Sequence, residues 1–124
     1  MAKVLVVDDD PALLELLVEV VAEAGHEVRQ ATNGRLALAV ARQEPLDLII
    51  SDIMMPLMTG TELLAALRAD ATLADLPVVL ISAGAPPPGD GRPEITVYLR
   101  KPFDLSVVED LIMRLTQPAS ELRK

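Results

Sequence analysis

The sequence contains no cysteine and no tryptophan, and among its 124 residues there are only one phenylalanine, one tyrosine and one histidine. Without cysteine the chain forms no disulfide and no thiolate metal site, a composition compatible with a reducing cytoplasm. Because aromatic residues are nearly absent while hydrophobic residues make up 51% of the chain, a core must be aliphatic. A chain of this length predicts one domain with one core.

Basic residues are also scarce, with 11 Lys and Arg against 19 Asp and Glu and a net charge of −8. Proteins that hold nucleic acid usually present a basic face, so we expect no direct nucleic acid binding. No apolar run approaches the length of a bilayer span, and "VLVV" at 4–7 is too short for a signal peptide. We therefore expect a cytoplasmic domain without a membrane partner.

Short apolar segments rich in β-branched residues predict five strands. These segments lie at 3–7, 27–31, 46–51, 77–82 and 95–99. The first, third and fourth are apolar on both faces, which is typical of buried parallel strands.

Helical patterns separate most of these segments. Asp10 followed by Pro11 predicts the start of a first helix, because aspartate caps a helix and proline needs no N–H in the first position. Gly25 predicts its end. A second helix is predicted over about 34–43, ending before Pro45.

The sequence "TGTE" at 59–62 predicts the start of a third helix, because Thr59 and Glu62 have the spacing of a capping box. A last helix is predicted to be capped by Asp104 or Ser106. The final residues, 118–124, are predicted to be a tail or the start of a linker.

The connection between the fourth and fifth predicted strands, residues 83–96, is rich in proline and glycine. These residues are Pro86, Pro87, Pro88, Gly89, Gly91 and Pro93. Proline lacks an N–H donor and clashes with the preceding helical turn, so we expect a loop with at most one helical turn.

Alternating strands and helices predict a parallel sheet with helices on both faces. In such sheets ligands bind beyond the carboxyl ends of the strands, and the predicted strands end in polar residues. These residues are Asp8 and Asp9, Asp52, Ser82, and Lys101.

Three neighbouring carboxylates repel one another unless a cation lies between them or one of them is protonated. An all-oxygen site without histidine or cysteine suits magnesium, which keeps several waters and leaves room for phosphate oxygens. Lys101 supplies a positive charge for a phosphoryl group, and a carboxylate in such a site is a candidate nucleophile.

The chain resembles the receiver domain of two-component response regulators over nearly its whole length. Four motifs carry the resemblance: "VVDDD" at 6–10, "DIMMPLMTG" at 52–60, "ISA" at 81–83 and "YLRKPF" at 98–103. It implies a flavodoxin-like, doubly wound sheet of five parallel strands in the order 2-1-3-4-5. It also implies a receiver domain over 1–117.

Matched position by position, the resemblance implies that Asp52 is the phosphoacceptor. Lys101 and the hydroxyl of Ser82 would hold phosphoryl oxygens. Tyr98 matches the aromatic switch residue that acts with Ser82, and the peptide bond between Lys101 and Pro102 would be cis.

The resemblance also implies a magnesium site. Asp9 and Asp52 would be direct ligands, Asp8 would act mainly through a coordinated water, and Met54 would contribute its backbone carbonyl.

Receivers normally place a helix between the fourth and fifth strands, where it helps to form the face used by dimers and targets. With this helix missing or reduced to a loop, we expect apolar surface near Tyr98 to be less covered than in a typical receiver. The domain is then expected to be a monomer or a weak homodimer.

The resemblance implies a signalling function: the domain accepts a phosphoryl group from a histidine kinase or a histidine-phosphotransfer protein and signals by altered binding. It would catalyse only its own phosphorylation and dephosphorylation. One alternative is a pseudo-receiver that binds partners without phosphorylation. Another is a magnesium-dependent aspartyl phosphohydrolase, although such enzymes usually have a second acid two residues after the nucleophile, where this chain has Met54. The sequence does not identify the kinase, the target or the pathway.

Overall fold

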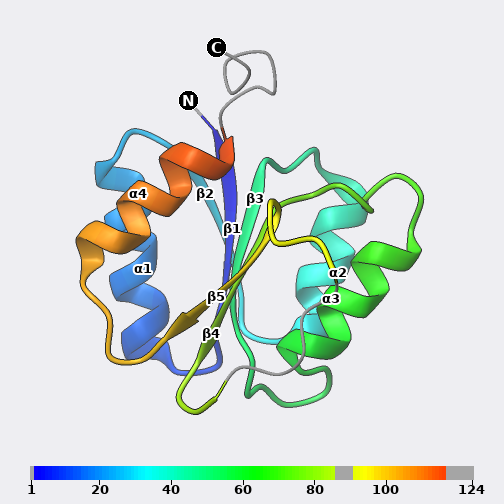
Figure 1. Ribbon diagram of the computed structural model, residues 1–124, viewed down its shortest axis with the longest axis horizontal. Coiled ribbons are helices and arrows are strands. Elements are labelled where there is room, and N and C mark those ends of the chain that lie inside the picture. The colour runs from blue at the N-terminus through cyan, green and yellow to red at the C-terminus, as the bar shows by residue number, and fades with distance from the viewer. Residues whose placement is uncertain (1, 86–90, 117–124) are drawn as a thin grey trace.

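Strands and helices alternate along the computed structural model, which describes residues 2–85 and 91–116. The strands are β1 (Lys3–Val7), β2 (Glu27–Ala31), β3 (Leu48–Asp52), β4 (Val78–Ser82) and β5 (Thr96–Arg100). The helices are α1 (Pro11–Glu23), α2 (Gly34–Gln43), α3 (Gly60–Ala69) and α4 (Leu105–Thr116). All neighbouring strands are parallel and their order is β2-β1-β3-β4-β5, which confirms the predicted flavodoxin-like sheet (Figure 1).

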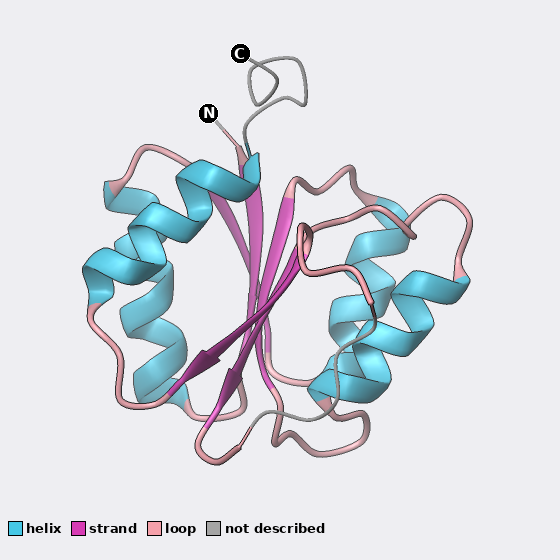
Figure 2. Ribbon diagram, in the orientation of Figure 1, coloured by secondary structure: helices cyan, strands magenta, loops and turns pink. Residues whose placement is uncertain are grey.

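The sheet separates two apolar clusters. Helices α1 and α4 cover one face, and α2 and α3 cover the other (Figure 2). Every residue of β3 and β4 is buried, and in β1 only Lys3 is not, as the two-sided apolar pattern predicted. The carboxyl ends of the strands lie together at the lower edge of the sheet in Figure 1.

Local signals set the helix boundaries as predicted. Asp10 caps α1, accepting the Ala12 N–H through its side chain at 3.0 Å. Thr59 and Glu62 form both hydrogen bonds of a capping box at the start of α3. Because α4 begins at Leu105, Asp104 is the residue that precedes the helix.

Three strands begin one or two residues later than predicted, and β3 and β5 also end one residue later. Before β3, the side chain of Asp47 accepts the backbone N–H of Lys3 at 2.8 Å. The Asp47 side chain thus accepts an N–H that a backbone carbonyl would accept in a regular parallel ladder, so the regular pairing of β3 with β1 starts only at Leu48. Before β4, Pro77 has no N–H to contribute to a ladder.

The connection between β4 and β5 contains no helix in its described residues, 83–85 and 91–95, as predicted. Residues 86–90, where the run of prolines falls, lie outside the described residues. The fourth helix in chain order, α4, follows β5 instead.

Two arginines attach the end of this connection to the turn before β4. Arg92 donates to the carbonyl of Ala74 at 3.1 Å and forms an ion pair with Asp75 at 2.8 Å. Arg68 of α3 donates to the same Ala74 carbonyl and to the hydroxyl of Thr96, at 3.2 and 2.8 Å. These contacts hold the start of β5 against α3.

Val97, Tyr98 and Leu99 of β5 are all partly exposed, and the thinner cover expected near Tyr98 stays a prediction. Among the described residues, the exposed large hydrophobic side chains are Leu16, Leu36, Met54, Leu57, Val107 and Met113, and none of them belongs to β4 or β5. Tyr98 is half-buried and packs against the cluster that contains Leu80. Within the described ranges, no helix has the length and apolar character needed to cross a membrane.

Candidate functional site

The first component of the site is the pair of carboxylates that follows β1. The buried strand ends at Val7, and the N–H of Asp8 continues the pairing with β2 by donating to Ala31 at 3.2 Å. Asp8 is fully buried, whereas Asp9 is exposed. The cap at Asp10 then turns the chain into α1, so that both carboxylates stay at the edge of the sheet.

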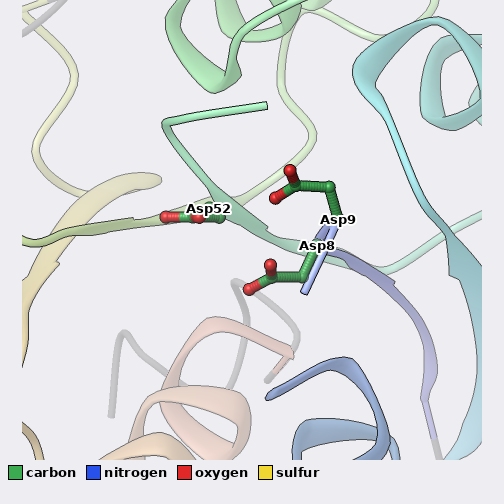
Figure 3. A group of neighbouring side chains, drawn as sticks. All are labelled: Asp8, Asp9 and Asp52. Atoms are coloured by element: carbon green, nitrogen blue, oxygen red, sulfur yellow. The ribbon is translucent and has the colours of Figure 1, made fainter. Parts of the chain in front are cut away.

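Asp52 is the last residue of β3, the strand adjacent to β1, and only 8% of its surface is exposed. Its Oδ1 accepts the N–H of Ile53 at 3.0 Å. One carboxylate oxygen from each of Asp8, Asp9 and Asp52 lies within 4.8 Å of the others. Figure 3 shows the side chains of Asp8 and Asp9 projecting from the end of β1 toward Asp52.

The buried carboxyl group of Asp8 has too few hydrogen-bond donors to stabilise a negative charge. Its Oδ1 accepts the N–H of Asp10 at 2.9 Å, but Oδ2 is buried without a hydrogen-bond partner among the described residues. Burial raises the pKa of Asp8 above its usual range, and the charge of Asp52 adds to the rise, outweighing the opposing effects of the Asp10 N–H and Lys101. A cation placed here would favour the charged form.

Lys101 approaches Asp52 from the side of β3 opposite to Asp8 and Asp9, because β5 and β1 lie on opposite sides of β3 in the sheet. It follows β5, and its N–H donates to the carbonyl of Ser82 at 2.8 Å, which extends the pairing of β5 with β4. Its Nζ lies 3.7 Å from Asp52 Oδ1. The peptide bond between Lys101 and Pro102 is cis.

Ser82 ends β4 and is buried, but its hydroxyl is engaged within its own loop. Ser82 Oγ donates to the carbonyl of Gly84 at 3.0 Å and accepts the Gly84 N–H at 3.3 Å. A phosphoryl group on Asp52 would have to compete with Gly84 for this hydroxyl.

Two other residues named from the sequence lie further out. The side chain of Met54 is 73% exposed, so only its backbone is suited to a role in a buried site. Tyr98 pairs in register with Leu80 of β4 and packs on the face of the sheet that α2 and α3 cover. Gly60, next to the predicted cap Thr59, was not singled out from the sequence, because its contact with Asp52 arises only in the folded chain.

A groove of about 750 Å³ lies at the opposite edge of the sheet, between the end of α2 and the turn before β4. The acids that line it are already engaged: Glu44 with Lys3 Nζ at 3.3 Å, Asp47 with the Lys3 N–H at 2.8 Å and Asp75 with Arg92 at 2.8 Å. The acidic cluster, with its uncompensated carboxylate, is therefore the candidate site.

A doubly wound sheet of this strand order, with three acids, a lysine and a serine at its carboxyl edge, defines a receiver-type phosphorylation domain. The family model described as the response regulator receiver domain matches residues 4–113. The chain belongs to this family and is a receiver domain of two-component signalling.

Relatives and solved structures agree with this assignment. The probable transcriptional regulator ycf29 of Pyropia yezoensis is 39% identical over 123 residues, covering 90% of this chain and 54% of that protein. The chemotaxis protein CheY4 of Vibrio cholerae has a TM-score of 0.82 at 34% identity, covering 93% of this chain and 98% of that one. The response regulator TrrA of Thermotoga maritima, solved in complex with Mg²⁺-BeF, has a TM-score of 0.81 at 32% identity, covering 93% and 99%. The chain spans about half the length of the first of these relatives.

Proposed function

We propose that Asp52 is the phosphoacceptor of this receiver domain. The observation that carries the proposal is the position of Lys101, whose Nζ lies 3.7 Å from Asp52 Oδ1. Asp8 and Asp9 complete the acidic cluster around Asp52, and of these three carboxylates it is Asp52 that pairs with a lysine.

In the proposed reaction, a carboxylate oxygen of Asp52 attacks the phosphorus of a phosphohistidine on the partner. The P–N bond breaks, its electron pair returns to the imidazole, and an acyl phosphate forms on Asp52. Lys101 offsets the negative charge of the transferring group, and the hydroxyl of Ser82 donates to a phosphoryl oxygen. Water later attacks the phosphorus of the acyl phosphate, the O–P bond breaks, and inorganic phosphate leaves as the Asp52 carboxylate is regenerated.

The residues present fit a magnesium ion. The donor set consists of oxygens alone, and the buried, unpartnered Oδ2 of Asp8 calls for a positive charge nearby. Asp9 and Asp52 would be direct ligands, Asp8 would bind mainly through water, and Met54 would offer its carbonyl. When bound, the ion supplies positive charge for the phosphoryl oxygens.

The proposed output is altered binding. Ser82 would exchange its hydrogen bond with Gly84 for one with the phosphoryl group, and Tyr98 would repack in response. The phosphodonor would be a histidine kinase or a histidine-phosphotransfer protein in the cytoplasm. We expect the domain to act on a protein target as a monomer or weak homodimer, without contacting nucleic acid or membrane itself.

Intact mass spectrometry tests the assignment after incubation with magnesium and acetyl phosphate. We expect one added phosphoryl group on the wild-type chain and none when magnesium is chelated. Asp52→Asn keeps the shape of the side chain but removes the nucleophile, so it should gain no phosphoryl group. Equal phosphorylation of Asp52→Asn and wild type would show that another residue is the acceptor.

A further inference from the structure

The first residue of α3, Gly60, lies directly against the backbone of Asp52. A β-carbon built on Gly60 would be 2.5 Å from the carbonyl oxygen of Asp52 and 2.8 Å from the Cα of Ile53. Both distances are shorter than the contacts that β-carbons make in proteins, and both neighbours are backbone atoms that cannot rotate away. A side chain at this position would therefore push α3 and Asp52 apart.

Hydrogen bonds connect this contact to the carboxylate. The N–H of Gly60 donates to the carbonyl of Ile53 at 2.8 Å. The N–H of Ile53 in turn donates both to Ile81 of β4 and to Oδ1 of Asp52, each at 3.0 Å. Ile53 is thus held between α3 and β4, and it holds an oxygen of the phosphoacceptor. A displacement of α3 would therefore reach Asp52 Oδ1 through the hydrogen bond from Gly60 to Ile53 and the one from Ile53 to Asp52.

The requirement for glycine at this position is one of space and not of backbone conformation. The glycines with positive φ among the described residues are Gly25 and Gly91. At Gly60 an alanine could adopt the same backbone angles and is the better helix former. Only the close approach to Asp52 argues against a side chain there.

We propose that Gly60 is a positioning residue for phosphoryl transfer. Because it lacks a side chain, the start of α3 packs closely against the backbone of residues 52 and 53, and this packing fixes the position of the Asp52 carboxylate. The role in transfer rests on the proposed function, whereas the seating of Asp52 does not. Small displacements of a reacting group produce large losses of rate, which makes the prediction measurable.

The test compares Gly60→Ala with two controls. Gly34→Ala, at the start of α2, introduces an equally close contact, 2.5 Å from the carbonyl oxygen of Met58 in the loop before α3, and its nearest neighbours do not include Asp52. Ala65→Gly weakens the exposed side of α3 without adding an atom. The two measurements are the amide chemical shift of Ile53 and the initial rate of acyl phosphate formation with acetyl phosphate and magnesium.

We expect Gly60→Ala to shift the Ile53 amide and to lower the rate by about tenfold or more. Gly34→Ala and Ala65→Gly should change both quantities much less. Changes in Gly60→Ala no larger than those in the two controls would overturn the proposal.

If Gly60→Ala does not fold, Thr59→Ala provides a second test. It removes the cap that accepts the Glu62 N–H at 3.2 Å and so loosens the start of α3 without adding atoms. The Ile53 amide should then change more than in Ala65→Gly, and an unchanged amide would contradict the proposal. A wild-type chain that accepts no phosphoryl group would overturn the proposed function, but the Ile53 shift would still test the seating of Asp52.

Discussion

The surroundings of Asp8 disfavour its negative charge. It is fully buried, one of its oxygens has no hydrogen-bond partner among the described residues, and burial raises its pKa. A carboxyl group with a raised pKa binds its proton more tightly in the folded state than in the unfolded state. Its contribution to stability is therefore fully present below the unfolded pKa and is lost as the pH rises through the folded pKa.

From this we predict that Asp8→Asn stabilises the metal-free protein at neutral pH. The asparagine keeps an oxygen for the Asp10 N–H but carries no buried charge. Urea unfolding in the presence of a chelator should show the gain at pH 7, and the gain should vanish toward the pH of ordinary aspartate titration.

Added magnesium provides the control for this prediction. Binding to the folded wild type stabilises it by mass action, so the advantage of Asp8→Asn should shrink as magnesium is added. An Asp8→Asn protein that is less stable than wild type at pH 7 with chelator present would show that Asp8 is adequately compensated by its protein neighbours.

At the scale of elements, the junction of α3, the turn before β4 and the start of β5 depends on Arg68. Its guanidinium donates to the carbonyls of Ala74 and Leu76 at 3.2 and 2.7 Å, and to the hydroxyl of Thr96 at 2.8 Å. Thr96 is buried, and in its described residues the β4–β5 connection offers no helix to cover it. Arg68 therefore joins α3, the turn before β4 and the start of β5 through its guanidinium.

We predict that Arg68→Met lowers the free energy of unfolding by about 2 kcal/mol, because hydrogen bonds from a charged donor to partly buried acceptors are lost while the apolar stem is kept. Urea denaturation followed by circular dichroism measures the change. The matched control is Arg42→Met on α2, whose ion pair with Asp70 spans 3.6 Å at the surface. That substitution should cost at most about 0.5 kcal/mol, and an equal loss in both variants would contradict the role of Arg68.

At the scale of the whole molecule, the proposed switch runs from the carboxyl edge of the sheet to its outer strand. Ser82 ends β4 with its hydroxyl bonded to Gly84, and Tyr98 lies in the middle of β5, the last strand of the sheet. Phosphorylation can shift the conformation only through contacts that differ between the two states, and the Ser82 hydroxyl offers such a contact.

We predict that Tyr98 responds to phosphorylation in the wild type and much less in Ser82→Ala. Tyr98 is the only tyrosine of the chain, so fluorotyrosine labelling gives a single ¹⁹F resonance for it. The resonance should move when magnesium and acetyl phosphate are added to wild type. Responses of the same size in both proteins, at equal phosphorylation by mass, would remove Ser82 from the switch.

The sequence by itself determined the type and order of the elements. Buried parallel strands need residues that are apolar on both faces, and helix starts need caps, so "KVLVV", Asp10 and the Thr59–Glu62 box carry their signals within a few residues. It also determined which side chains gather at the site, because the carboxyl ends of parallel strands meet at one edge. The absence of a helix in the described part of the β4–β5 connection follows from proline and glycine alone.

Only the tertiary structure decided how these groups are held. The orphaned oxygen of Asp8, the bond from Ser82 to Gly84 and the seating of Gly60 on Asp52 depend on distances between segments far apart in the chain, or on the path of a loop. Burial is a property of everything that packs around a residue, and no local pattern records that Arg68 of α3 and Arg92 of the β4–β5 connection both reach the carbonyl of Ala74.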